Sequence, residues 1–232
     1  ALVGIGAPFL FGEWKPLVAL SLLLAAWIVL SALLNFVERV RSTRAGQSFF
    51  TAARRQPRSF FGMHLAHLGI AVFIVGVTMV GAYQAEKDVK MEVGDTVSVG
   101  GYTFRFNGVR PVQGPNYRAL VGDIDLVSDG RTIRKMFPEK RFYVASSMPM
   151  TEAAIDTGLL RDVYVSLGEP IDKARPDAAW AVRVYYKPFV DWIWGGCVLM
   201  ALGGLVAMTD RRYRVKAAAH SPAPPVSLAQ NA

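Results

Sequence analysis

The sequence predicts an integral membrane protein in which α-helical spans carry an inserted small all-β domain. Hydrophobic residues make up 52% of the 232 residues and charged residues only 19%, and the mean hydropathy is +0.27. Three stretches carry no charged residue, at 16–37, 59–85 and 192–209. Each is close to the roughly 20 apolar residues with which an α-helix crosses a bilayer. Between the last two, apolar and polar residues alternate, as in strands. These observations exclude a soluble globular protein and a wholly disordered chain.

The excess positive charge lies beside the predicted spans. The formal net charge is +8. Six arginines accompany a single acid, Glu38, within 38–58, and four further cations follow the last span at Arg211, Arg212, Arg214 and Lys216. Short basic segments next to spans stay on the cytoplasmic side of a membrane. A nucleic-acid-binding protein would instead carry a basic stripe on a folded domain, so no nucleic-acid partner is expected.

These charges predict the order of segments in a multi-pass protein of the bacterial inner membrane. A periplasmic segment at 1–15 precedes a span at 16–37, a basic cytoplasmic loop at 38–58 and a span at 59–85. A periplasmic β domain at 86–187, a span at 188–209 and a cytoplasmic tail at 210–232, first basic and then rich in Ala and Pro, follow. The first residues lack the basic start of a signal peptide, so we expect the chain to begin inside a longer protein.

The region 86–187 is predicted to form a small antiparallel barrel or sandwich. Alternating segments predict strands at 97–99, 102–106, 119–127 and 180–185, separated by turn signals such as Gly100-Gly101 and Asp129-Gly130. Further strands are expected at 132–136, 140–146 and 161–166. About seven short strands in a hundred residues are typical of such folds. Its balanced charge favours a protein-binding module.

We expect no catalytic site in this domain. It contains neither His nor Cys, and its carboxylates are scattered along strands and turns. Asp123 and Asp125 lie two residues apart on one strand and are expected to share an ordinary solvent-exposed face. The segment Met148–Met150 is expected to be a loop.

Two histidines within the second predicted span are the candidates for chemistry. At about 100° per residue along a helix, His64, His67, Ala71 and Ile74 fall on one stripe, whereas the small residues Gly62, Ala66, Gly69 and Gly76 fall on the opposite face. The small-residue face is suited to close packing against another helix. His220, the third histidine, lies in the tail and is uninformative.

A histidine inside a membrane is costly and usually functional. Four roles suit it: a proton relay, a metal ligand, an axial ligand of haem, or a hydrogen bond between helices. Ordinary metal binding is disfavoured because the stripe contains no Asp, Glu or Cys. Haem needs a neutral imidazole nitrogen and a flat space beside it, which the stripe offers at His67. His64 lies nearer the cytoplasmic end, where a structural role is expected.

Four segments resemble the C-terminal part of the CcmF family, the membrane haem-lyase component of bacterial cytochrome c maturation. They are 61–69, which contains both histidines, 163–169, 180–190 and 203–213. The resemblance extends from about residue 15 to residue 215, and it also fits a paralogue dedicated to nitrite reductase. It implies covalent attachment of haem to apocytochrome c, with haem delivered by the chaperone CcmE and apocytochrome handled by CcmH. It further implies a resident haem b held between two transmembrane histidines, one of which maps onto His67.

The resemblance is incomplete, because other family features are absent from the sequence. The family's tryptophan-rich haem-binding motif, its two periplasmic histidines and the second transmembrane histidine have no counterpart here. We therefore expect the C-terminal third of a haem lyase, inactive alone and dependent on the rest of the CcmF membrane bundle. His67 would ligate the haem iron, Ala71 and Ile74 would line the face of the porphyrin, and His64 would contribute less directly.

Two other functions stay open from the residues. In a non-enzymatic membrane scaffold, His67 would bond across helices and the β domain would dock a partner without a cofactor. A proton-coupled transporter subunit is disfavoured, because it would need an acidic residue inside a span and the three uncharged stretches contain none.

Overall fold

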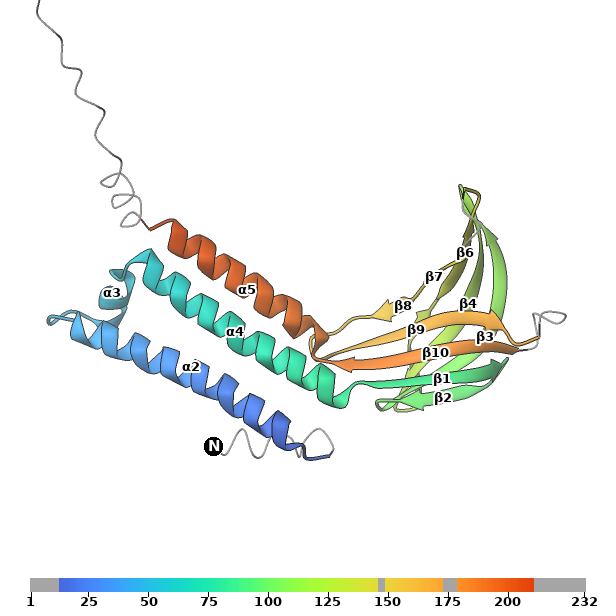
Figure 1. The fold of residues 1–232 in the computed structure, drawn as a ribbon, viewed down its shortest axis with the longest axis horizontal. Coiled ribbons are helices and arrows are strands. Elements are labelled where there is room, and N and C mark those ends of the chain that lie inside the picture. The colour runs from blue at the N-terminus through green and yellow to red at the C-terminus, as the bar shows by residue number, and fades with distance from the viewer. Residues whose placement is uncertain (1–12, 146–148, 173–178, 211–232) are drawn as a thin grey trace, which may run out of the picture. The chain divides into compact units, whose positions relative to one another are not determined.

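The computed structural model describes residues 13–145, 149–172 and 179–210, which form three long helices, one short helix and ten strands (Figure 1). The long helices are α2 (Pro16–Ser42), α4 (Arg58–Tyr83) and α5 (Val190–Met208). All three are long and apolar enough to cross a membrane. The predicted fold class of apolar spans with an inserted all-β domain is therefore confirmed. The predictions for 1–12, Met148 and 211–232 concern residues outside the described part of the chain.

Helix α2 extends well beyond its uncharged stretch at the C-terminal end. α2 continues past residue 37 to Ser42 and carries Arg39 and Arg41 in its last turn, where cations are favoured by the helix dipole. The short helix α3 (Phe49–Arg54) follows, and the Ser48 side chain caps it by accepting the Thr51 backbone N–H at 3.3 Å. A helix need not end where the hydrocarbon ends, because its backbone is hydrogen-bonded internally.

Two compact units divide the chain, and the division passes through the long helices. One unit comprises residues 1–24 and 72–194, and the other comprises 25–71 and 195–232. The first contains the whole β domain with the adjoining helix ends. The second contains α3 and the remaining parts of the three long helices.

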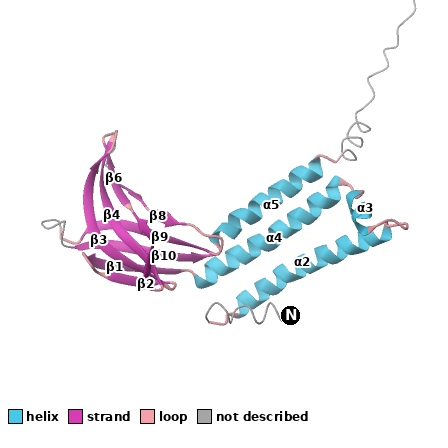
Figure 2. Cartoon of the chain, turned by 180° about the vertical axis from the view of Figure 1, so that it is seen from behind, coloured by secondary structure: helices cyan, strands magenta, loops and turns pink. Residues whose placement is uncertain are grey.

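The β domain consists of two antiparallel sheets (Figure 2). The smaller sheet has the order β1 (Ala85–Glu92), β10 (Ala179–Pro188), β9 (Arg161–Pro170) and β8 (Ala154–Asp156). The larger has the order β2 (Thr96–Val99), β3 (Tyr102–Gln113), β4 (Tyr117–Ser128), β6 (Glu139–Tyr143) and β7 (Pro149–Glu152). Strand β5 (Arg131–Met136) also pairs with β4.

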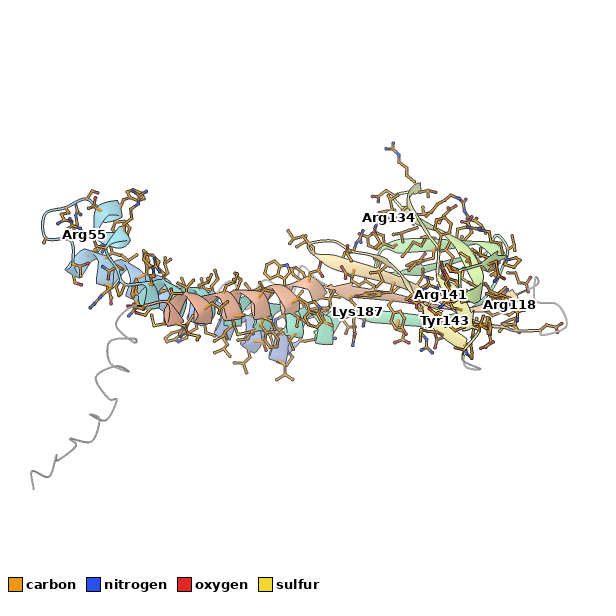
Figure 3. All side chains as sticks on the ribbon, turned by 90° about the horizontal axis from the view of Figure 1, so that it is seen from above. Arg55, Arg118, Arg134, Arg141, Tyr143 and Lys187 are labelled. Carbon is orange, nitrogen blue, oxygen red and sulfur yellow. The ribbon has the colours of Figure 1, made fainter. Side chains whose placement is uncertain are left out.

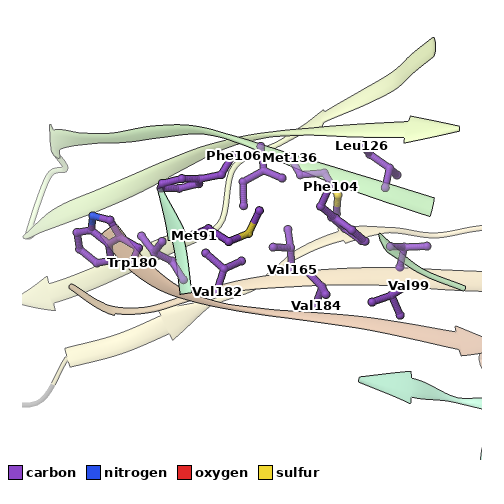
Figure 4. Packing of buried hydrophobic residues seen from close by; sticks show 13 residues of the cluster. Met91, Val99, Phe104, Phe106, Leu126, Met136, Val165, Trp180, Val182 and Val184 are labelled. Carbon is purple, nitrogen blue, oxygen red and sulfur yellow. The ribbon is translucent and has the colours of Figure 1, made fainter. Parts of the chain in front are cut away.

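A single apolar core lies between these sheets (Figure 4). Alternate residues of β3, β4, β9 and β10 supply most of it, because successive side chains of a strand point to opposite faces, and β1, β2 and β5 each add one residue. Phe104, Phe106 and Trp180 are its largest members. The others are Met91, Val99, Ile124, Leu126, Met136, Val163, Val165, Leu167, Val182 and Val184.

Two expectations for this domain were wrong. Asp125 is buried rather than solvent-exposed, because β4 has strands on both sides and the side chains of Arg105 and Lys135 cover its carboxylate at 2.8 and 3.6 Å. Pro149 and Met150 belong to strand β7 and not to a loop, since they pair with β6. Both errors arise from pairing between strands, which the local sequence does not reveal.

Candidate functional site

The glycine face of α4 packs closely against α5. A Cβ atom added to Gly69 would lie 2.7 Å from the backbone nitrogen of Met200 and 2.8 Å from the carbonyl oxygen of Gly196. Gly62 is equally crowded by the backbone of Gly203 and Ala207. The predicted small-residue packing is thus confirmed, and it leaves the opposite side of α4 for the histidines.

Each ring nitrogen of His64 lies near a backbone carbonyl oxygen, one on α4 and one on α2. Nδ1 lies 2.8 Å from the Phe60 carbonyl oxygen, and Nε2 lies 3.0 Å from the Ala32 carbonyl oxygen on α2. The rings of Phe60 and Phe36 flank the imidazole, with centroids at 4.2 and 5.5 Å. Both partners are acceptors, so a neutral imidazole donates to one of them at a time. His64 therefore has no nitrogen lone pair directed to an open space, and it holds α4 against α2.

His67 is different, because only one of its nitrogens is engaged. Nδ1 lies 2.8 Å from the carbonyl oxygen of Met63, one turn earlier in α4. A carbonyl only accepts, so in the neutral imidazole Nδ1 carries the proton and Nε2 keeps its lone pair. No hydrogen bond to Nε2 is found within the described part of the chain, and the side chain is exposed. This tautomer is the one in which Nε2 binds a metal.

A hollow of about 200 Å³ lies beside His67, between α2 and α4. Ser31, Ala32 and Asn35 line it from α2, and Met63 and His64 line it with His67 from α4. Ser31 and Asn35 were not predicted as site residues, although both are polar residues four apart in an uncharged span. The Ser31 hydroxyl donates to the Ile28 carbonyl at 3.0 Å, so the exposed amide of Asn35 is the main polar group beside His67.

Ala71 and Ile74 do not line this hollow. Ala71 is buried, and Ile74 belongs to the other compact unit. Their contact with a porphyrin stays a prediction.

The β domain brings no comparable group of ligands together. Among the described residues, no cluster of three or more His, Cys, Asp or Glu side chains could hold a metal ion. Several of its charged side chains are instead paired with one another, as in Arg105–Asp125 and Arg134–Asp156. Arg141, labelled in Figure 3, binds Glu139 at 2.7 Å and stacks over the Tyr117 ring at 4.7 Å.

The pKa values of two carboxyl groups of the domain are shifted in opposite directions. A hydrogen bond from Arg105 lowers the pKa of Asp125 below its ordinary value. Burial raises the pKa of Asp162, and the hydrogen bond from the Gly158 N–H opposes that shift only in part. Within the described residues, neither carboxyl group belongs to a cluster that could hold a metal ion.

Comparisons with known proteins bear on the family and the fold of the chain. A family model described as the CcmF C-terminal beta-sandwich matches residues 82–188, which contain all ten strands. The cytochrome c-type biogenesis protein CcmF of Pseudomonas aeruginosa is 45% identical over 216 residues, which is 93% of this chain and 32% of the relative. The chain belongs to the CcmF family, of which it carries the C-terminal region.

Further matches agree with this membership and define its extent. CcmF of Haemophilus influenzae is 46% identical over 194 residues, covering 84% of this chain and 29% of the relative. A solved structure titled Cytochrome c Heme Lyase CcmF has a TM-score of 0.67 at 18% identity, covering 89% of this chain and 33% of that one, and so shows the shared fold. The chain spans about a third of the length of the CcmF proteins it matches.

Proposed function

We propose that this chain acts in cytochrome c maturation as the C-terminal part of a membrane haem lyase of the CcmF type. The carrying observation is the open Nε2 of His67, whose tautomer is fixed by the Met63 carbonyl inside an apolar helix. An imidazole directed away from its own helix within a membrane needs a partner. Haem iron is the partner that the family points to, and a low-spin b-type haem is the proposed cofactor.

The donor chemistry of the site fits a haem, although its volume does not enclose one. The hollow of about 200 Å³ is smaller than the roughly 300–1,000 Å³ typical of pockets that surround a ligand. Nε2 of His67 would hold the haem iron, and the Asn35 amide would serve as a hydrogen-bond donor or acceptor beside it. A further ligand and the remaining walls would come from the rest of the CcmF bundle. When bound, the haem would supply the electron that keeps an incoming haem iron reduced.

The remaining parts of the chain have proposed roles consistent with this site. The β domain would lie in the periplasm and contact the haem carrier CcmE, the apocytochrome chaperone CcmH or apocytochrome c itself. The basic loop 38–58 and the C-terminal tail would lie in the cytoplasm, as the distribution of arginines predicts. Thioether formation between haem vinyl groups and the thiols of apocytochrome c would take place in the assembled lyase and not in this chain alone.

A matched pair of histidine variants tests the assignment in the assembled complex. His67→Gly is expected to abolish the b-type absorbance, because the iron loses an axial bond, and added imidazole is expected to restore it. His64→Gly is expected to keep the absorbance and to lower the thermal stability, since His64 joins α4 to α2. The amount of each complex in the membrane is measured by immunoblot, so that loss of haem is separated from loss of protein.

Unchanged haem content in His67→Gly would overturn the assignment of the ligand. A purified wild-type complex without colour would favour a scaffold instead, in which His67 Nε2 bonds to another helix. That outcome would leave the family membership intact and would remove the cofactor.

A further inference from the structure

Two leucines occupy the tip of the turn that joins β8 to β9. Leu159 is 76% exposed and Leu160 is 56% exposed. The backbone N–H of Arg161 donates to the Gly158 carbonyl at 3.2 Å and closes the turn around them. Turn tips in water favour Gly, Pro, Asn, Asp and Ser. A rigid turn with two adjacent exposed leucines therefore suggests a surrounding other than water.

The carbonyl groups of this turn are hydrogen-bonded inside the protein. The Leu159 carbonyl accepts the indole Nε1–H of Trp192 at 2.9 Å. The Leu160 carbonyl accepts the backbone N–H of Phe189 at 2.9 Å, and the Gly158 carbonyl is bonded within the turn. In an apolar medium an unbonded carbonyl costs several kcal/mol. The turn thus presents apolar side chains outward while these three carbonyl groups are satisfied.

These hydrogen bonds also fix the level of the turn along the membrane normal. Helix α5 begins at Val190 and has 19 residues, which is about 28 Å at 1.5 Å per residue. The hydrocarbon layer is about 30 Å thick, so the whole helix is needed to cross it. Phe189 and Trp192 must then lie at the edge of the hydrocarbon, and so must the turn that is bonded to them.

The junction between β10 and α5 is shaped to hold this contact. Phe189 has a φ of +56°, a left-handed backbone conformation that is unfavourable for a non-glycine residue. Its ring packs against Trp192 with a centroid distance of 5.1 Å. Just before it, the Lys187 ammonium lies over the rings of Tyr164 and Tyr185 at 5.4 and 5.6 Å. Aromatic rings and a lysine at this level are typical of the layer of lipid headgroups.

We propose that Leu159 and Leu160 insert into the edge of the bilayer, so that lipid is the partner of this surface. The turn then anchors the β domain on the membrane independently of its chain connections to α4 and α5. This inference goes beyond the proposed haem site and does not depend on His67.

Spin labels on the full chain reconstituted in lipid nanodiscs test the proposal. Labels are placed at Leu159→Cys, Leu160→Cys and the control Val144→Cys, each in a Cys197→Ala background. Val144 is an apolar residue that is 85% exposed. Val144 follows Tyr143, which pairs with Tyr117 at the start of β4. Arg161, next to the two leucines, contacts Tyr102 near the other end of β4. The control position and the turn therefore lie toward opposite ends of this strand. The nanodiscs contain phosphatidylethanolamine and phosphatidylglycerol.

Collisional relaxation by oxygen and by a water-soluble nickel chelate distinguishes three environments of a spin label: lipid, water and the protein interior. We expect a ratio of oxygen to nickel accessibility several-fold higher at 159 and 160 than at 144. We also expect that doxyl-labelled lipids broaden amide or label signals of the turn and leave position 144 unaffected. Nickel access at 159 and 160 equal to that at 144 would show a turn in water and overturn the proposal. Low access to both reagents, repeated in the complete CcmF assembly, would show burial against polypeptide and would overturn it as well.

Discussion

The β domain and the long helices differ in how much of their apolar surface the chain itself covers. In the β domain, thirteen apolar side chains form a core between the two sheets. In the apolar 18-residue stretch of each long helix that could cross a membrane, no more than 22% of the residues are buried. The β domain thus obtains its stability from its own contacts, whereas the helices leave most of their surface to lipid or to other helices.

The same contrast applies to polar groups and bears on function. In the β domain a buried carboxylate such as Asp125 has cationic partners within the domain. In the helices, the Nε2 atom of His67 and the amide of Asn35 have no hydrogen-bond partner in the described part of the chain. Open polar groups inside a span indicate a site that is completed by something else. The β domain is therefore the self-sufficient part of the molecule, whereas the proposed haem site on the helices would be completed by other groups.

Removal of a core ring is the largest expected perturbation of the β domain. Phe104 is 0% exposed, so Phe104→Ala should lower the free energy of unfolding by about 3–5 kcal/mol. Phe142 is 39% exposed, and Phe142→Ala should cost less than about 1 kcal/mol. Urea unfolding of the β domain, followed by near-ultraviolet circular dichroism in detergent solution, measures both. Similar losses for the two variants would contradict a self-sufficient core.

Among the helices, the largest effect is expected where α4 touches α5. Gly69→Ala should lower stability by about 1–3 kcal/mol, because the added methyl group meets backbone atoms that cannot move aside easily. At Gly195 in α5, an added Cβ would meet no heavy atom within 4 Å. Gly195→Ala is therefore the matched control, with little change or a small gain expected. Thermal unfolding in detergent micelles compares them, and an equal response would mean that the two helices do not depend on this contact.

Regular patterns in the sequence predicted most of the fold. Runs without charge identified the three long helices, and the spacing of Gly62 and Gly69 identified the face of α4 that packs closely. Strand β1 was missed because six of its eight residues are polar, charged or small, and only Val89 and Met91 are apolar and large. Its conformation depends on pairing with β10 along its whole length.

The candidate site could be predicted only in part. Helical spacing brought His64 and His67 to one side of α4, but their different roles depend on the carbonyl groups of Ala32 and Met63. The position of Asn35 beside His67 requires knowledge of how α2 packs on α4. Contacts between elements far apart in the sequence were therefore the part that local patterns could not supply.

Two aspartates of the β domain should respond oppositely to neutralisation, and this sharpens the picture of a domain that pairs its own charges. The Arg105 hydrogen bond lowers the pKa of Asp125 from its ordinary value of 3.8. Its charged form is thus favoured in the folded state, and the resulting stability is present above the unfolded pKa and is lost as the pH falls through the folded pKa. Asp125→Asn should cost about 1 kcal/mol at neutral pH, because its partners Arg105 and Lys135 are half-exposed and screened.

For Asp162 the sign is reversed. Burial raises its pKa, so the folded state favours the protonated form, and the stability this gives is lost as the pH rises through the folded pKa. In Asp162→Asn, the amide oxygen can accept from the Gly158 N–H, which lies 3.1 Å from Oδ1 of Asp162. The amide NH2 can donate to the Tyr164 hydroxyl oxygen, which lies 3.2 Å from Oδ2 of Asp162. Asp162→Asn should therefore be neutral or stabilising, by up to about 0.5 kcal/mol at neutral pH. Unfolding midpoints of both variants at about pH 7 and about pH 3 decide the matter. A loss for Asp162→Asn as large as that for Asp125→Asn would mean that the Asp162 carboxylate is charged and paired in the folded domain.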